Sequence, residues 1–118
     1  MEGYEILKTA VRALDGKKAI DLKVIEIQNV TVIADYFVLA TATSSPHVRA
    51  LAEEVEEKLS EEGVEPGHIE GKTTGWILLD YGDVIVHIMD AKNREFYALE
   101  HTWNDGKELS VEELVNIK

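Results

Sequence analysis

Residues 75–90 constrain the fold of this chain more than any other segment, because they predict a β-hairpin with two different faces. Hydrophobic side chains dominate both halves of the segment, and Gly82-Asp83 separates the halves. A two-residue turn at that dipeptide is the simplest connection between antiparallel strands. It places Trp76 opposite Met89. The predicted strands cover residues 76–81 and 84–90.

Alternation along the two strands sorts their side chains onto two faces. One face is apolar apart from a single phenol, and we expect it to lie under helices. The other combines large apolar side chains with an aspartate and a histidine, whose polar atoms would need partners inside a core. The first face comprises Ile77, Leu79, Tyr81, Val84, Val86 and Ile88, and the second Trp76, Leu78, Asp80, Ile85, His87 and Met89.

The composition of the second face favours an exposed surface that binds another protein. A solvent-facing sheet rarely carries so much apolar area, and Trp and Met beside isolated polar groups are typical of protein interfaces. The alternative is that a further helix, such as one formed by the C-terminal segment, covers this face. The pattern leaves both interpretations open.

The remaining periodicity predicts a single α/β domain. Ser45 suits the N-cap of a long helix, Pro46 its first position and Gly63 its end. Residues 36–41 are apolar nearly throughout, which is typical of a central strand. In residues 19–27 the alternation slips after Val24, which indicates a bulge or a strand buried on both faces. Helices are expected over 4–14, 46–62 and 91–101, with a capping box at 110–113 that opens a short C-terminal helix or turn, and strands over 19–27, 36–41, 76–81 and 84–90.

Composition excludes several classes of function. The 118 residues include no cysteine, so disulfides, thiolate zinc sites and thiol catalysis are excluded. The formal charge of −11 argues against direct binding of nucleic acid and favours a basic partner protein. We expect no membrane span, because no apolar run approaches about 20 residues. The acidic N-terminus lacks the features of a targeting peptide, so we expect a cytoplasmic protein.

The sequence predicts neither a metal site nor a cofactor. The four histidines lack the short spacings that metal ligation favours. Residues 41–45 lead from a strand into a helix, where phosphates can bind, but the lysine and repeated glycines of a phosphate loop are missing. Asp80 and Asp83 could hold magnesium, although a turn carboxylate explains Asp83 more simply.

Three segments resemble the signatures of the ribosomal silencing factor family, also called the Iojap family. They are residues 34–54 (ADYFVLATATSSPHVRALAEE), Glu70-Gly71 with residues 75–89 (GWILLDYGDVIVHIM), and residues 94–103 (REFYALEHTW). Ala42 and Pro46 depart from the usual glycine and arginine. The resemblance implies a mixed sheet flanked by helices, similar to nucleotidyltransferases. It assigns residues 1–104 to the family domain and residues 105–118 to a variable C-terminal tail.

The resemblance also implies a function. Members of the family bind large-subunit ribosomal protein uL14, block the joining of the ribosomal subunits and repress translation, without catalysis. The matching partner-binding surface is the second hairpin face and its surroundings. We therefore expect partner contacts from Trp76, Leu78, Asp80, Asp83, His87 and Met89.

Two other classes of function stay open. A small nucleotidyltransferase-like enzyme would hold triphosphate at Ser44-Ser45 and magnesium at Asp80 with a neighbouring carboxylate. No acidic pair follows the serines at short spacing, since Glu53 and Glu54 lie well along the helix. A homodimer without a ribosomal role would use the same apolar face.

Overall fold

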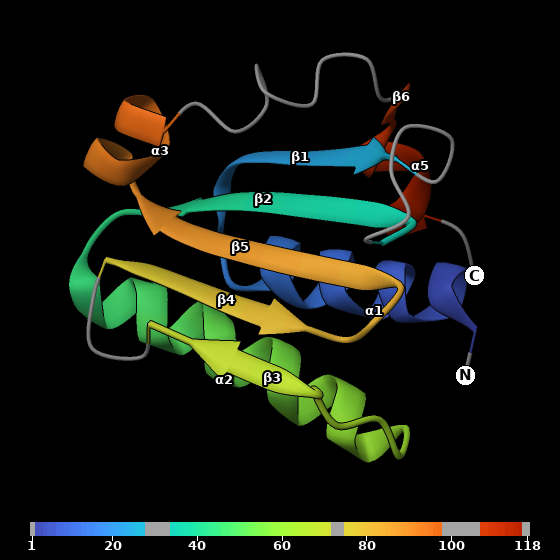
Figure 1. Cartoon of the computed structure of the whole chain (residues 1–118). Helices are drawn as coiled ribbons and strands as arrows, with labels where there is room; N and C mark the ends of the chain where they lie inside the picture. The colour runs from blue at the N-terminus through green and yellow to red at the C-terminus, as the bar shows by residue number, and fades with distance from the viewer. Residues whose placement is uncertain (1, 28–33, 72–74, 98–106, 117–118) are drawn as a thin grey trace.

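The computed structural model describes residues 2–27, 34–71, 75–97 and 107–116, and in them a six-stranded sheet organises the chain (Figure 1). Helices α1 and α2 both pack against one face of this sheet, which we call the helix face; we call the opposite face the open face. The elements are α1 (Gly3–Gly16), β1 (Ile20–Glu26), β2 (Tyr36–Ala42), α2 (Ser45–Glu61), β3 (His68–Glu70), β4 (Trp76–Asp80), β5 (Val84–Asp90), α3 (Ala91–Tyr97), β6 (Lys107–Leu109) and α5 (Val111–Asn116).

The sheet is mixed, which confirms the predicted α/β class. Its strand order is β3-β4-β5-β2-β1-β6. Strands β2 and β5 are parallel, and every other neighbouring pair is antiparallel. All seven residues of β2 are buried, as the apolar sequence of this strand predicted for a central position.

The hairpin has the predicted register. Trp76 lies opposite Met89, and Leu78 lies opposite His87. The turn places Gly82 at a φ of 85°, a conformation that costs glycine little and other residues more. This register fixes which side chains of β4 and β5 face α1 and α2, because a slip by one residue would exchange the two faces.

The helix face carries the larger hydrophobic core. The apolar stripe of α2 is buried as its spacing predicted, and so is most of that of α1. Tyr4 is an exception, because its side chain is 41% exposed near the start of α1. The buried residues of the two helices and of the hairpin in this core are Ile6, Leu7, Ala10, Val11, Ala13, Leu14, Val48, Leu51, Ala52, Val55, Leu59, Ile77, Leu79, Tyr81, Val84, Val86 and Ile88.

The sheet extends beyond the four predicted strands at both edges. Strand β3 pairs with β4, and β6 pairs with β1. Each has three residues, too few to show an alternating pattern in the sequence. Residues 98–101 of the helix predicted over 91–101 lie outside the described residues.

Strand β1 is irregular at its start and buried on both faces at its end. The register shifts between Ile20 and Lys23, earlier than the predicted slip. Val24 packs in the helix-face core, whereas Ile25 and Ile27 pack on the open face. The loss of alternation after Val24 therefore reflects burial on both faces, and the bulge is a separate feature.

The C-terminal segment that the sequence separates as a variable tail contributes to the same core. Strand β6 extends the sheet, and α5 packs against α1. Leu114 is only 3% exposed. One of the two hydrogen bonds of the predicted capping box is present, because the Ser110 hydroxyl accepts the Glu113 N–H at 3.2 Å. No helix in the described ranges is both long enough and apolar enough to cross a bilayer.

The start of α2 differs from the prediction by one residue. Ser44, not Ser45, is the N-cap, and its hydroxyl accepts the N–H of His47 at 3.2 Å. We expect Ser44→Ala to lower the free energy of unfolding by about 1 kcal/mol, because this donor would lose its partner. The matched control Ser45→Ala should change it by no more than a few tenths of a kcal/mol. Urea denaturation of both variants measures the difference, and equal losses would contradict the assigned cap.

Candidate protein-binding face

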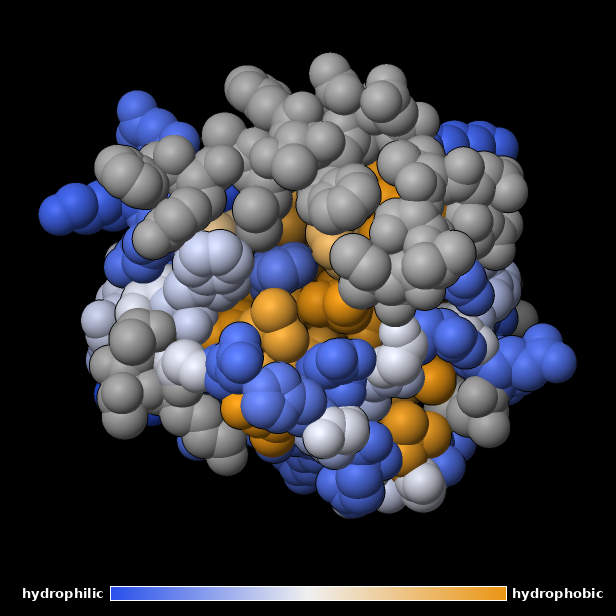
Figure 2. Space-filling model, viewed as in Figure 1, coloured by the Kyte–Doolittle hydropathy of each residue, from blue (hydrophilic) through white to orange (hydrophobic). Residues whose placement is uncertain are grey.

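The open face carries a second apolar cluster in the middle of the sheet. Strands β1, β2 and β5 supply most of its buried members, while Trp76 and Leu78 of β4 pack against it from the side. Figure 2 shows apolar side chains gathered on this side of the molecule, in the view of Figure 1 in which α1 and α2 lie behind the sheet. The buried members are Ile25, Ile27, Ala34, Phe37, Leu39, Ile85 and Met89.

The six predicted partner-binding residues differ in exposure. Trp76, Leu78 and Asp80 are half-buried, and Asp83 is exposed. The expectation that the whole set is exposed is wrong for His87, which is 6% exposed, and for Met89, which is fully buried. Both belong to β5, whose two neighbouring strands supply large side chains on either side. The accessible part of the predicted surface is therefore on β4 and in the hairpin turn that follows it.

His87 links the buried and the accessible parts of this face. The indole N–H of Trp76 donates to Nδ1 of His87 at 3.2 Å. The ring of Phe37 meets the imidazole edge-on, with centroids 5.1 Å apart and an interplanar angle of 71°. Burial lowers the pKa of His87 to about 4, so the ring is neutral at physiological pH. Because Nδ1 accepts a hydrogen bond, the proton of the neutral ring resides on Nε2.

The two predicted aspartates close the hairpin turn. The Asp80 carboxylate accepts the N–H of Gly82 at 2.8 Å. The carbonyl of Asp83 accepts the N–H groups of Asp35 and Tyr36 at 2.8 and 3.0 Å, which ties the turn to the start of β2. Four residues of extended strand separate Asp80 from Trp76, a span of about 13 Å. The aspartates therefore lie at the other end of β4 from the indole.

The residues that a nucleotidyltransferase-like site would need, Ser44-Ser45 and Asp80, lie at opposite ends of the sheet. Asp80 is level with Ile85 and hence with Phe37 near the start of β2, whereas Ser44-Ser45 follows the end of that strand. Five residues of strand, about 17 Å, separate the level of Asp80 from the end of β2. This distance is too long for one magnesium ion to bridge Asp80 and a phosphate bound at Ser44-Ser45. Within the described ranges, no three His, Asp or Glu side chains cluster as metal ligands would.

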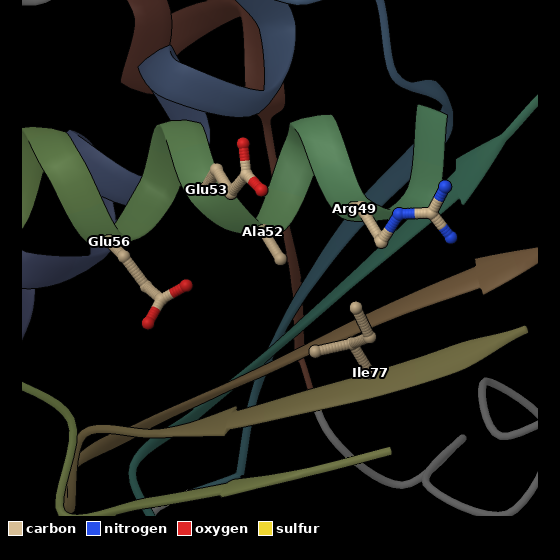
Figure 3. Close-up of a pocket in the computed structure, with 5 residues that line it drawn as sticks. All are labelled: Arg49, Ala52, Glu53, Glu56 and Ile77. Carbon is tan, nitrogen blue, oxygen red and sulfur yellow. The ribbon is translucent and has the colours of Figure 1, made fainter. Parts of the chain in front are cut away.

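A small cavity opens on the helix face between α2 and β4 (Figure 3). Ile77 points from β4 toward the helix, and the charged side chains of Arg49 and Glu56 extend from α2 on either side of Ala52. The cavity has a volume of about 70 Å³ and is also lined by Glu53. Sites for small-molecule ligands usually enclose about 300–1,000 Å³, so this cavity is too small for a nucleotide.

A polar arrangement that the sequence analysis missed fixes the end of the sheet beside Trp76. The Asp90 carboxylate accepts the N–H of Asn93 at 2.8 Å at the start of α3, and the Asp90 N–H donates to the carbonyl of Gly75 at 2.8 Å. A side chain at Gly75 would run into the Asp90 carboxylate. Buried Arg94 donates to Thr41 at 2.9 Å. The glycine directly before Trp76 was the signal available in the sequence.

The low pKa of His87 predicts that the protein loses stability in acid. An unfolded histidine takes up a proton near pH 6.5, whereas folded His87 resists protonation down to about pH 4. Between pH 6.5 and 4 the unfolded state therefore takes up a proton that the folded state does not. The free energy of unfolding is unaffected by this group above pH 6.5 and falls by about 3 kcal/mol as the pH is lowered toward 4. We expect the free energy of unfolding of the wild type to fall more steeply over this range than that of His87→Phe. Parallel curves from urea denaturation would contradict the buried neutral ring.

Comparison with known proteins identifies the family. Residues 2–118 match the model of the family described as ribosomal silencing factor during starvation. Two relatives named as ribosomal silencing factors come from Halalkalibacterium halodurans, 33% identical over 98% of this chain and 100% of its own, and from Bacillus subtilis, 35% identical over 90% and 91%. A crystal structure of a Chromobacterium violaceum protein superposes with a TM-score of 0.85 at 37% identity, covering 93% of this chain and 92% of its own. The chain belongs to the ribosomal silencing factor family.

Proposed function

We propose that this protein is a ribosomal silencing factor that binds ribosomal protein uL14 of the large subunit through the open face around Trp76 and Leu78. Bound there, it sterically blocks the small subunit from joining and represses translation. Its site of action is the cytoplasm, where ribosomes assemble. The protein acts by occupying a surface, and no catalytic step is part of the proposal.

The half-buried pair of large apolar residues on β4 is the observation that carries this proposal. Trp76 and Leu78 sit at the margin of a buried apolar cluster, so a partner that covers them extends a core that already exists. Tryptophan is among the residues that contribute most to binding when a partner desolvates it. The family and the names of the relatives support a role at the ribosome. The choice of uL14 on the large subunit is what the resemblance of the sequence to the family implies.

The charge of the chain supports a basic partner. Its 23 acidic and 12 basic residues give a formal charge of −11, which attracts a basic ribosomal protein at long range. Asp80 and Asp83 add negative charge at the turn end of the hairpin. Because charges at the rim of an interface mainly affect the association rate, we expect the rate of binding to fall as salt rises.

Subunit joining provides the direct test of function. We expect an excess of the protein, added to separated subunits before magnesium is raised, to reduce the fraction of joined ribosomes in a sucrose gradient. The protein should sediment with the large subunit. A joined fraction that stays unchanged at saturating protein, with no protein on the large subunit, would contradict the proposal.

The two faces of β4 supply a matched pair of variants. We expect Trp76→Ala to weaken binding to isolated uL14 by about 2 kcal/mol, roughly thirtyfold, and to lower the free energy of unfolding by less than Ile77→Ala does. Ile77→Ala should do the reverse, because Ile77 is buried in the helix-face core. Emptying that site should cost about 2–5 kcal/mol of unfolding free energy. Denaturation and calorimetric titration measure both effects, and an exchange of the two outcomes would invert the assigned faces.

A homodimer through the open face would compete with uL14 for the same surface. Sedimentation of the protein alone, over the concentrations of the titration, separates the two equilibria. If the two contacts share one surface, binding to uL14 should weaken as the protein self-associates. Independent equilibria would place the two contacts on different surfaces.

A further inference from the structure

His87 places a polar imidazole inside an apolar cluster, where an apolar side chain would be expected. Its side chain is 94% buried among apolar and aromatic neighbours, and its Nε2 atom has no hydrogen-bond partner in the part of the chain that the structure describes. Since Nδ1 is an acceptor, Nε2 carries an N–H that has left water without compensation. An apolar residue of similar volume would avoid this cost. The position therefore keeps a group that lowers the stability of the fold.

Nδ1 of His87 suggests why a destabilising histidine is kept at this position. Nδ1 receives the N–H of Trp76 at 3.2 Å, and Phe37 holds the imidazole edge-on from the neighbouring strand. The indole and imidazole centroids are 5.8 Å apart, with the rings tilted by 47°. A buried ring that is itself held in place thus fixes the direction of the half-buried indole.

We propose that His87 is a positioning residue that holds the indole of Trp76 in the orientation in which it meets the partner. This inference rests on the proposed function, in which Trp76 is the central contact. Holding a large side chain in its bound orientation removes part of the entropy that binding would otherwise lose. The neutral Nδ1 acceptor is the part of His87 that performs this role.

A purely structural histidine would behave differently. If His87 only filled space, its replacement by a ring without nitrogen would leave the partner affinity unchanged. If its hydrogen bond mainly stabilised the fold, the same replacement would lower the free energy of unfolding. If His87 positions Trp76, the same replacement should keep or increase the free energy of unfolding and should weaken partner binding. The low pKa of His87 keeps Nδ1 available as an acceptor at physiological pH.

The test compares His87→Phe with His87→Gln in the full chain. Phe keeps a planar ring without the acceptor, and Gln supplies an amide oxygen that can accept the indole N–H. We expect His87→Phe to unfold at the same or a higher urea concentration than the wild type and to bind uL14 about fivefold or more weakly. His87→Gln should recover part of the affinity. The control Met89→Leu, in the same buried layer, should bind within about twofold of the wild type.

Two spectroscopic readouts test the positioning without the partner. Long-range ¹H–¹⁵N correlation of the wild type should show the Nε2–H tautomer, and His87→Phe should change the near-UV circular dichroism of the tryptophans. Wild-type affinity in His87→Phe, or an Nδ1–H tautomer, would overturn the proposal. If the wild type itself does not bind uL14, the proposed function fails, and the tautomer and dichroism alone decide whether His87 orients Trp76.

Discussion

The parallel pairing of β2 with β5 is the constraint on which the rest of the molecule depends. Seven consecutive residue pairs join these strands, from Tyr36 with Val84 to Ala42 with Asp90. Parallel strands end at the same edge of the sheet, so α2 and α3 both begin there. The antiparallel hairpin then brings the start of β4 back to this edge. Trp76 is thereby placed beside the residues that close the end of β5.

Burial on both faces of the two central strands separates the roles of the two faces. The helix face is closed by α1 and α2 and supplies most of the buried apolar area. The open face has its own cluster, in which Met89 is fully buried, whereas Trp76 and Leu78 at its margin are only half-buried. The partly accessible residues that pack against this cluster, Trp76 and Leu78, both lie on β4 nearer the edge of the sheet, where a partner can reach them without disturbing the central pair.

The sequence predicted the features that depend on local pattern. The register of the hairpin, the buried stripe of α2 and the central place of β2 follow from alternation, helical spacing and apolar content. The exposure of His87 and Met89 could not be read in this way, because it depends on side chains of strands that are distant in the chain, such as Phe37. The three-residue edge strands lack a period, and two adjacent serines made the N-cap of α2 ambiguous by one position.

Mapping of the bound surface by methyl and indole NMR tests the central claim most directly. On titration with uL14, the indole N–H of Trp76 and the methyl groups of Leu78 should shift most strongly. The methyl groups of Leu7, Leu51 and Leu59 in the helix-face core should keep their positions. The strongest shifts on α1 or α2, with Trp76 unchanged, would contradict docking through the open face.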